Sequence, residues 1–169
     1  MTAIETERLV LHRLVPDDAP FILELVNDPA WLRYIGDKGV RTLDDARAYI
    51  TNGPVASYAR HGFGLDRVEL RGSATPIGIC GLVKRDALPD ADVGFAFLPG
   101  YRGQGFAYEA AAAVLRHAGE SLKLPRIAAI VSPDNLGSIR VLEKLGLRFE
   151  TTIRMAADRP ETKLFGRAL

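Results

Sequence analysis

Cysteine is almost absent from this sequence of 169 residues, because Cys80 is its only one. A lone cysteine excludes an internal disulfide. Long apolar runs are also missing, and no stretch approaches the about 20 residues that a membrane-spanning helix needs. The opening residues, 1–8, lack the basic segment and the apolar run of a secretory signal. These absences predict a cytoplasmic protein with no membrane partner.

Neither positive nor negative charge is in large excess. The chain has 22 Lys and Arg residues against 21 Asp and Glu residues, for a formal net charge of +1. This balance gives no overall attraction to nucleic acid, so we expect no nucleic-acid partner. The apolar fraction of 47% is ordinary for a folded soluble protein. The length predicts a single domain, residues 1–169, and leaves monomer and homodimer equally open.

The pattern of apolar residues predicts an α+β fold in which an antiparallel meander precedes alternating strands and helices. The strand at 126–131 is apolar throughout, as expected for burial on both faces. Gly53-Pro54 should interrupt or shorten the longest helix of the first half. Strands are predicted over 8–14, 62–70, 75–83, 91–98, 126–131, 147–154 and 162–168, and helices over 16–26, 31–34, 42–60, 104–122 and 138–145.

The most informative segment is Gly100-Tyr-Arg-Gly-Gln-Gly-Phe-Ala107, which stands between a predicted strand and a predicted helix. Glycine is costly to order, so three of them here need a reason. They let the backbone turn sharply and bring its N–H groups together at a helix N-terminus, where the helix dipole also favours an anion. The segment therefore predicts a phosphate site, and a plain glycine-rich turn is the alternative.

Two familiar phosphate loops do not fit this segment. A P-loop needs Gly-Lys-Ser/Thr at its end, and the dinucleotide loop has the order Gly-x-Gly-x-x-Gly after a first strand. Here the order is Gly-x-x-Gly-x-Gly, and it follows a β-meander.

Three segments together resemble the GNAT superfamily of N-acetyltransferases. Arg102–Ala107 fits the family's coenzyme A loop, Arg/Gln-x-x-Gly-x-Gly/Ala, and Val131–Leu147 resembles its strand, asparagine, helix and glycine segment. Thr6–Leu14, followed by Asp17-Asp-Ala19, is similar to the opening of the branch that acetylates ribosomal-protein N-termini at alanine or serine. The resemblance spans residues 5–168 in the correct order and spacing.

The resemblance implies a GNAT-type fold: a mostly antiparallel central sheet, splayed open at the cofactor site, with helices on both faces. The opening should lie between the strand ending at Leu98 and the strand 126–131. It implies acetyl-coenzyme A as co-substrate and no metal. The pyrophosphate should meet the N–H groups of 102–107, and the pantetheine arm should run along 93–98. The implied cofactor-binding residues are Phe97, Leu98, Arg102, Gly103, Gln104, Gly105, Phe106, Ala107 and Asn135.

The implied activity is transfer of an acetyl group to a primary amine by direct attack, with a protein N-terminal α-amine favoured. An acetyltransferase for a small-molecule amine or antibiotic is one alternative. A catalytically weak domain that senses acyl-coenzyme A is another. The acceptor is expected near Trp31, Tyr34 and the loop 36–39, although Trp31 is equally suited to covering the core.

Asp92 and Ser138 are the candidate catalytic residues. Asp92, just before the cofactor strand, is expected to act as the general base, directly or through water; a solvated acid or an ion pair is the alternative. A backbone N–H near Phe97 or Leu98 should polarise the thioester carbonyl. Many relatives carry a tyrosine as general acid where this chain has Leu142.

Ser138 matches a serine that approaches the coenzyme sulfur in the branch named above, and a helix-start role is its alternative. Asn135 is expected to cap the helix, to contact the pantetheine arm, or to do both. Glu109 is expected to be a structural or substrate-orienting acid, and His12 is expected to be structural. Cys80 is expected to lie in the core, with a ping-pong route through an acetyl-cysteine as its alternative. His61 is a minor catalytic candidate.

Overall fold

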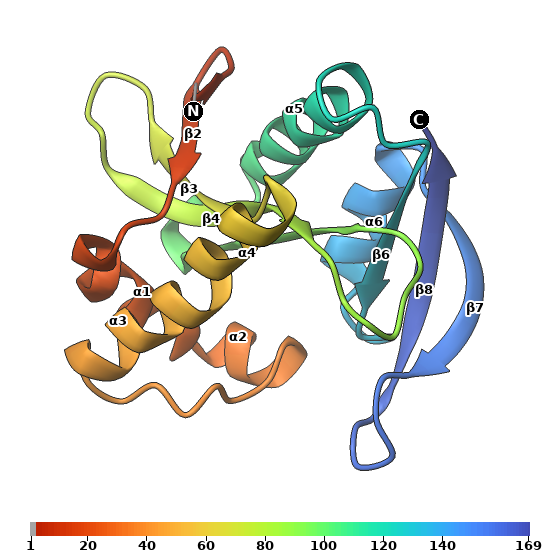
Figure 1. Ribbon diagram of the computed structural model, residues 1–169, viewed down its shortest axis with the longest axis horizontal. Helices are drawn as coiled ribbons and strands as arrows, with labels where there is room; N and C mark the ends of the chain where they lie inside the picture. The colour runs from red at the N-terminus through yellow and green to blue at the C-terminus, as the bar shows by residue number, and fades with distance from the viewer. Residues whose placement is uncertain (1–2) are drawn as a thin grey trace.

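The computed structural model describes residues 3–169. Residues 1 and 2, the first two of the predicted domain 1–169, lie outside the described part. One eight-stranded sheet runs through the chain in the order β1-β2-β3-β4-β5-β6-β8-β7 (Figure 1). Its strands are β1 (Ile4–Glu5), β2 (Leu9–Arg13), β3 (Leu65–Leu70), β4 (Pro76–Val83), β5 (Asp92–Phe97), β6 (Arg126–Val131), β7 (Arg148–Arg154) and β8 (Glu161–Ala168).

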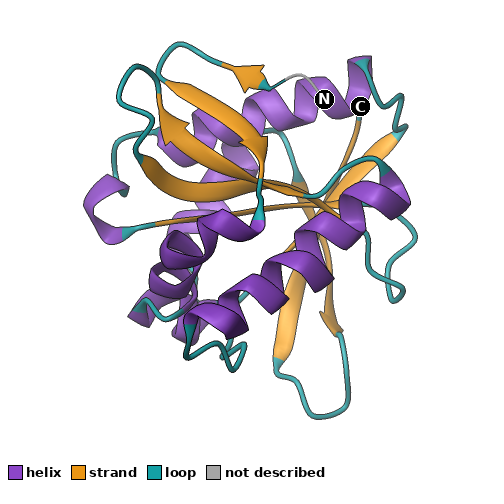
Figure 2. Cartoon of the chain, turned by 60° about the vertical axis from the view of Figure 1, so that its left-hand side comes forward, coloured by secondary structure: helices purple, strands orange, loops and turns teal. Residues whose placement is uncertain are grey.

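Helices cover both faces of this sheet, as predicted (Figure 2). Each helical layer packs against the sheet through its own apolar core. One core includes Leu14, Ile22 and Ile50. The other includes Val114, Ile127 and Leu142. The first layer holds η1 (Pro16–Asp18), α1 (Ala19–Val26), α2 (Pro29–Tyr34), α3 (Leu43–Ile50), η2 (Thr51–Val55) and α4 (Ala56–His61). The second holds α5 (Phe106–Glu120) and α6 (Leu136–Lys144), with the short 3-10 turn η3 (Pro99–Tyr101) before α5.

The sheet opens between β5 and β6, where the sequence predicted the split. In the described part of the chain these two strands share a single residue pair, Asp92 with Ala128, and they are the only parallel neighbours. The Ala128 N–H donates to the Ala91 carbonyl over 2.9 Å. The strands on either side of the split pair over their length, β4 with β5 and β6 with β8. Beyond Asp92 and Ala128, β5 and β6 therefore diverge.

The helical segment predicted over 42–60 is present, and its regular α-helical geometry is interrupted at Gly53-Pro54, as predicted. Thr42 caps α3 by accepting from the Asp45 N–H, and Asp45 completes a capping box. The chain then widens into the π-helical turn η2, which contains Pro54, and continues as α4. A wide turn accommodates a residue that has no N–H to donate. The proline therefore alters the helix locally, and Gly62, with φ of 78°, ends it.

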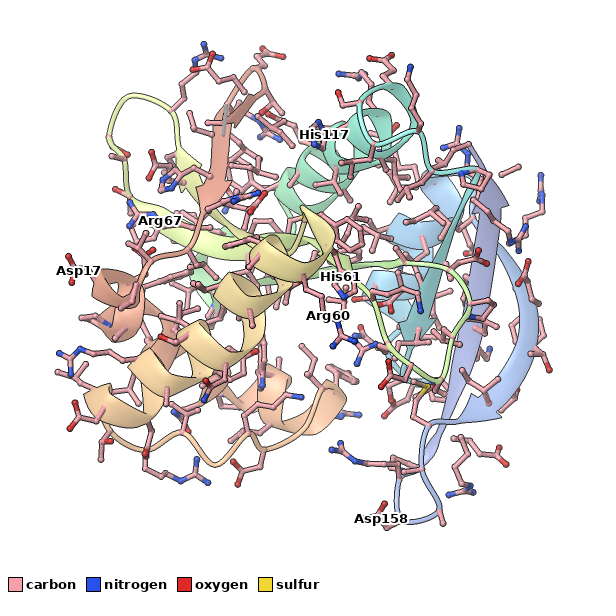
Figure 3. The ribbon with its side chains drawn as sticks, viewed as in Figure 1. Asp17, Arg60, His61, Arg67, His117 and Asp158 are labelled. Carbon is pink, nitrogen blue, oxygen red and sulfur yellow. The ribbon has the colours of Figure 1, made fainter. Side chains whose placement is uncertain are left out.

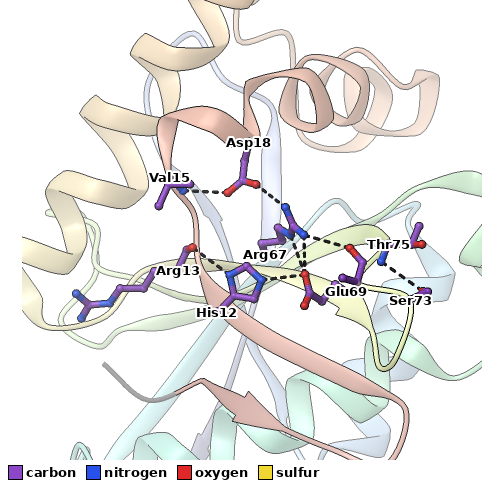
Figure 4. A network of polar contacts seen from close by, with 9 residues as sticks. His12, Arg13, Val15, Asp18, Arg67, Glu69, Ser73 and Thr75 are labelled. Carbon is purple, nitrogen blue, oxygen red and sulfur yellow. Dashed lines mark hydrogen bonds and ion pairs between the residues drawn. The ribbon is translucent and has the colours of Figure 1, made fainter.

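A polar network ties the first helical layer to the sheet (Figure 4). His12 on β2 lies 2.9 Å from a carboxylate oxygen of Glu69, and Arg67 bonds that oxygen and Asp18 at 2.6 Å each. Asp18 also accepts from the Val15 N–H. Burial alone would raise the pKa of Glu69, but the bonds from His12 and Arg67 outweigh it and lower the pKa. His12 is structural, as expected. No helix in residues 3–169 is long and apolar enough to cross a membrane.

Candidate active site

The glycine-rich loop turns the chain from β5 into α5. After η3, Gly103 and Gly105 take φ angles of 74° and 83°, in the left-handed region that side chains with a Cβ avoid. Gly105 is the N-cap of α5, and no side chain caps this helix. A Cβ at Gly103 would meet no heavy atom within 4 Å, so the space beside it is open. The loop conformation and the open space are the features that a bulky anion requires.

The amide N–H groups of residues 103–108 make no hydrogen bond to any residue of the described chain. The Tyr101 N–H donates to the Leu98 carbonyl and the Arg102 N–H donates to the Pro99 carbonyl, so the row begins at Gly103. Such groups at a helix N-terminus carry partial positive charge and need acceptors. The site fits a pyrophosphate, and the free row is shifted by one residue from the expected 102–107.

Arg102 does not present its charge to this row of N–H groups. Its Nε donates to the Phe97 carbonyl over 3.0 Å, and its Nη2 lies 2.6 Å from the Asp28 carboxylate. Asp28 is buried and also caps α2 by accepting from the Ala30 N–H. A buried carboxylate therefore competes with phosphate for the Arg102 guanidinium, and the assignment of Arg102 as a cofactor-binding residue stays a prediction. Arg102 fixes the loop against α2 and the end of β5.

Arg8 is the cation that the sequence did not assign to the loop. Its Nη1 donates to the Gln104 carbonyl over 3.0 Å, and its guanidinium carbon lies 4.2 Å from the centre of the Phe106 ring. Glu109 holds it in place: the Glu109 carboxylate accepts from Arg8 Nε at 2.7 Å and from the Thr6 hydroxyl at 2.6 Å. These contacts give Glu109 a structural role, one of the two roles expected for it. In the sequence, Thr6-Glu-Arg8 belongs to a segment that resembles the family, but nothing in that resemblance placed Arg8 beside the glycine-rich loop.

The free edge of β5 supplies further backbone groups. The Leu98 N–H donates to the Ile77 carbonyl over 2.9 Å, so it cannot polarise a thioester as proposed for it. Phe97 faces Gly78 across the ladder, and hydrogen-bonded pairs alternate along antiparallel strands. The N–H groups of Phe97 and Phe95 therefore point away from β4, toward the split. Phe95 was missed because the strand register was needed to find it.

Asp92 lies where β5 and β6 meet, and only 1% of its surface is exposed. Val93 packs in the core beneath α5, so by strand alternation Asp92 faces the layer of α1–α4. Its carboxylate accepts from Arg85 Nε over 3.1 Å. Burial raises the pKa of Asp92 to about 6, although Arg85 acts in the opposite direction. Asp92 is therefore not a solvated acid; it is a buried ion-pair partner whose pKa lies close to neutrality.

Asn135 and Ser138 stand on the other arm of the split, after β6. The Asn135 side-chain oxygen caps α6 by accepting from the Ser138 N–H over 3.3 Å. The Ser138 hydroxyl forms no hydrogen bond with residues 3–169 and is half-buried. Leu142, where a tyrosine was expected in many relatives, is buried in the core. The described chain places no direct contact between Asp92 and Ser138.

The minor candidates fall into structural positions. Cys80 is fully buried, and burial raises the pKa of its thiol, so it does not serve as a nucleophile. Trp31 is a buried member of the core beneath α1 and α3. Arg33 stacks over the Tyr34 ring at 4.8 Å. His61, at the end of α4, stacks on Phe63 at 5.4 Å (Figure 3).

Two hollows lie in the described chain, and neither is lined by Asp92 or Ser138. A cavity of about 260 Å³ lies beneath β1 and is lined by Asp66 and Tyr58, among others. A groove of about 850 Å³ follows the side of α5 from Tyr108 to Gly119 and includes Lys144. The groove starts one turn from the glycine-rich loop and is the hollow that adjoins the row of N–H groups. Within residues 3–169, no His, Cys, Asp and Glu side chains gather in a group that could hold a metal ion.

Known proteins resemble this chain over nearly all of its length. The uncharacterized N-acetyltransferase YnaD of Bacillus subtilis (strain 168) is 31% identical over 147 residues, which is 87% of this chain and 83% of that protein. The structure of a GNAT-family acetyltransferase from Bacillus anthracis matches with a TM-score of 0.82 and 27% identity, covering 99% of this chain and 98% of the other. RimL, a ribosomal L7/L12 α-N-protein acetyltransferase solved with coenzyme A, shares the fold with a TM-score of 0.81 and 17% identity, covering 99% and 98%. The family model of the acetyltransferase (GNAT) domain matches residues 8–148, and the chain therefore belongs to the GNAT family of acyl-coenzyme A-dependent N-acetyltransferases.

Proposed function

We propose that this chain, as one domain over residues 1–169, transfers an acetyl group from acetyl-coenzyme A to a primary amine, with a protein N-terminal α-amine as the favoured acceptor. The observation that carries the proposal is the row of free N–H groups at residues 103–108, which opens beside the free edge of β5. GNAT acetyltransferases use acetyl-coenzyme A, so the row has a natural ligand in its pyrophosphate. No metal enters the proposal.

The residues that would hold the coenzyme follow from these contacts. The pyrophosphate would be bound by the N–H groups of Gly103, Gln104, Gly105, Phe106 and Ala107. Arg8 would add positive charge beside Gly105, because a Cβ built on that glycine would lie 3.4 Å from Arg8 Nη2. The N–H groups of Phe95 and Phe97 would bind the pantetheine arm and polarise the carbonyl. The Asn135 amide would approach the arm from the opposite side. The coenzyme supplies the thioester whose acetyl group is transferred.

Asp92 would take the proton that the amine must lose. The amine nitrogen forms a bond to the thioester carbonyl carbon, the carbon–sulfur bond breaks, and the proton passes to Asp92 directly or through water. With a pKa of about 6, the carboxylate is mostly ionised at neutral pH and is a stronger base than an ordinary aspartate. A protein α-amine, with a pKa of about 8, is about one-tenth neutral at pH 7, whereas a lysine near 10.4 is almost fully protonated. The α-amine is therefore the easier acceptor for this site.

Ser138 would stabilise the departing sulfur. Its hydroxyl has no partner in the described chain, and it sits in the first turn of α6 across the split from β5. A hydroxyl can donate to a thiolate without being a strong acid, which suits a site where Leu142 is buried. RimL, an α-N-protein acetyltransferase, shares this fold, so the fold is compatible with an α-amine acceptor.

The test measures coenzyme A release with peptides bearing free α-amines, lysine peptides blocked at the N-terminus, and small amines including aminoglycosides. We expect the α-amine peptides to be turned over fastest. Asp92→Asn should be rescued on the α-amine as pH rises from 7 to 9, because the free amine becomes abundant, and should stay slow on lysine. Preferential turnover of an aminoglycoside would move the acceptor to the small-molecule class. Tight acetyl-coenzyme A binding with no turnover of any amine would identify a sensor domain.

A further inference from the structure

Three basic side chains come from segments that converge beside the split, and one of them, Arg85, contacts Asp92. Arg85, in the loop between β4 and β5, contacts Asp92 at 3.1 Å. Lys38 lies in the loop between α2 and α3, and Arg159 lies in the hairpin between β7 and β8. That loop and that hairpin touch, because a Cβ built on Gly36 would lie 3.7 Å from Arg159 Nη1. We refer to Lys38, Arg85 and Arg159 as the basic cluster.

The charges of the basic cluster are close enough to act on one another. The pKa of Lys38 is lowered, first by partial burial and then by the positive charges of Arg159 and Arg85. Arg85 also acts on Tyr49 of α3, whose pKa is raised by burial and partly restored by that guanidinium. Segments from three distant parts of the chain therefore bring like charges together beside the split.

The described chain offers little negative charge in return. Lys38 and Arg159 form no side-chain hydrogen bond or ion pair with residues 3–169. Asp37, the neighbour of Lys38, is bound to Arg41 at 2.5 Å. Asp158 stands at the tip of the hairpin and forms no ion pair with the described residues (Figure 3). Of the three cations, Arg85 forms an ion pair with a carboxylate of the described chain, that of Asp92, whereas Lys38 and Arg159 form none within residues 3–169.

We propose that the basic cluster binds an oxyanion of the acceptor, a carboxylate or a phosphate, close to the amine that is acetylated. The inference rests on the acetyl transfer proposed above and specifies its acceptor. Like charges held together at a protein surface are costly, and an anion removes that cost. The cluster also repels an acceptor that carries only its ammonium charge. An amine next to an anion approaches without that penalty, and the positive field then favours loss of the ammonium proton.

The test uses short peptide amides that start with a free serine and differ at the second residue. That residue is aspartate, phosphoserine or the neutral control asparagine. We expect kcat/KM to be at least about tenfold higher for the anionic peptides than for the neutral one. In Lys38→Met/Arg159→Met the preference should fall to about twofold or less. The matched variant Arg47→Met/Arg148→Met removes the same charge from exposed positions outside the cluster, and it should keep the preference.

A binding measurement tests this inference independently of the acetyl-transfer activity. Calorimetry measures the affinity of the N-acetylated, unreactive forms of the same peptides for the protein. A tighter Kd for the anionic forms, lost only in the cluster variant, supports the inference even if no peptide is turned over, a result that would count against the proposed function. A larger gain for phosphoserine than for aspartate identifies phosphate as the source of the oxyanion. Equal turnover and equal affinity for anionic and neutral peptides would overturn the inference while leaving acetyl transfer in place.

Discussion

Replacing Arg85 by methionine should move the pH dependence of the reaction to higher pH. The change removes a guanidinium 3.1 Å from Asp92 and leaves the carboxylate buried. Since burial raises the pKa of Asp92 to about 6 and Arg85 acts against it, losing Arg85 raises the pKa further. The Arg85 side chain is 39% exposed, so solvent screens part of the pair. We expect a shift of about one pH unit, equivalent to about 1.4 kcal/mol.

The rate follows from the ionised fraction of Asp92, because only the carboxylate accepts a proton. With a pKa of about 6 in the parent protein and about 7 in the variant, the ratio of ionised fractions is about 0.3 at pH 6.5 and about 0.9 at pH 8. The ratio of kcat/KM for variant and parent should therefore rise about threefold over this range. The acceptor amine titrates equally in both proteins, so its own ionisation cancels in the ratio.

The assay measures initial rates of coenzyme A release between pH 5.5 and 8.5. The acceptor is a peptide with a free α-amine and no acidic side chain, so that any binding of an anion by Arg85 does not enter. Asp92→Asn serves as the control and should lack the acid limb near pH 6. A variant-to-parent ratio that stays constant across the range would refute the assignment of Asp92 as the titrating base.

Three other substitutions examine the remaining parts of the site. Gly105→Val should weaken acetyl-coenzyme A binding, because φ of 83° costs a residue with a Cβ about 1–2 kcal/mol; calorimetry should find Gly100→Ala, at a position open to solvent, close to the parent. Ser138→Ala should lower kcat without changing the affinity for acetyl-coenzyme A, and an unaltered kcat would return the serine to a helix-start role. Arg102→Met leaves the buried Asp28 carboxylate without its 2.6 Å partner. It should lower the free energy of unfolding in urea by about 1–3 kcal/mol, and an unchanged midpoint would contradict the contact.

The local pattern of the sequence was enough for most of the fold. Alternation predicted the strand 91–98, observed as Asp92–Phe97, and the cap and turn residues predicted α6 and the glycine at its end. The interruption at Gly53-Pro54 was predicted, but its form was not: Pro54 sits in a wide turn, a tertiary accommodation that local propensity does not encode.

The sharp turn of the glycine-rich loop was predictable from the sequence, whereas the side-chain contacts around the loop were not. Gly103 and Gly105 take the positive φ angles that their positions suggested. Arg102, in contrast, turns to a carboxylate more than 70 residues earlier in the chain, and Arg8 fills the place beside the loop. Such pairings depend on which segments the fold brings together. The same holds for Leu98, whose N–H is consumed by a neighbouring strand.

The meeting of β5 and β6 at one residue pair has a consequence for hydrogen exchange in solution. Strands β1–β5 form one wing and β6–β8 the other, and the ladder that joins them is Asp92 with Ala128. Amide protons along the inner edges of both wings should exchange with deuterium faster than those inside either wing, because few hydrogen bonds protect them. A ligand bound in the split contacts both wings and stabilises their arrangement. At 100 times its Kd it adds about 2.7 kcal/mol, which slows exchange through global opening about 100-fold. If acetyl-coenzyme A binds there as proposed, it would join the two halves of the sheet as well as supply the acetyl group.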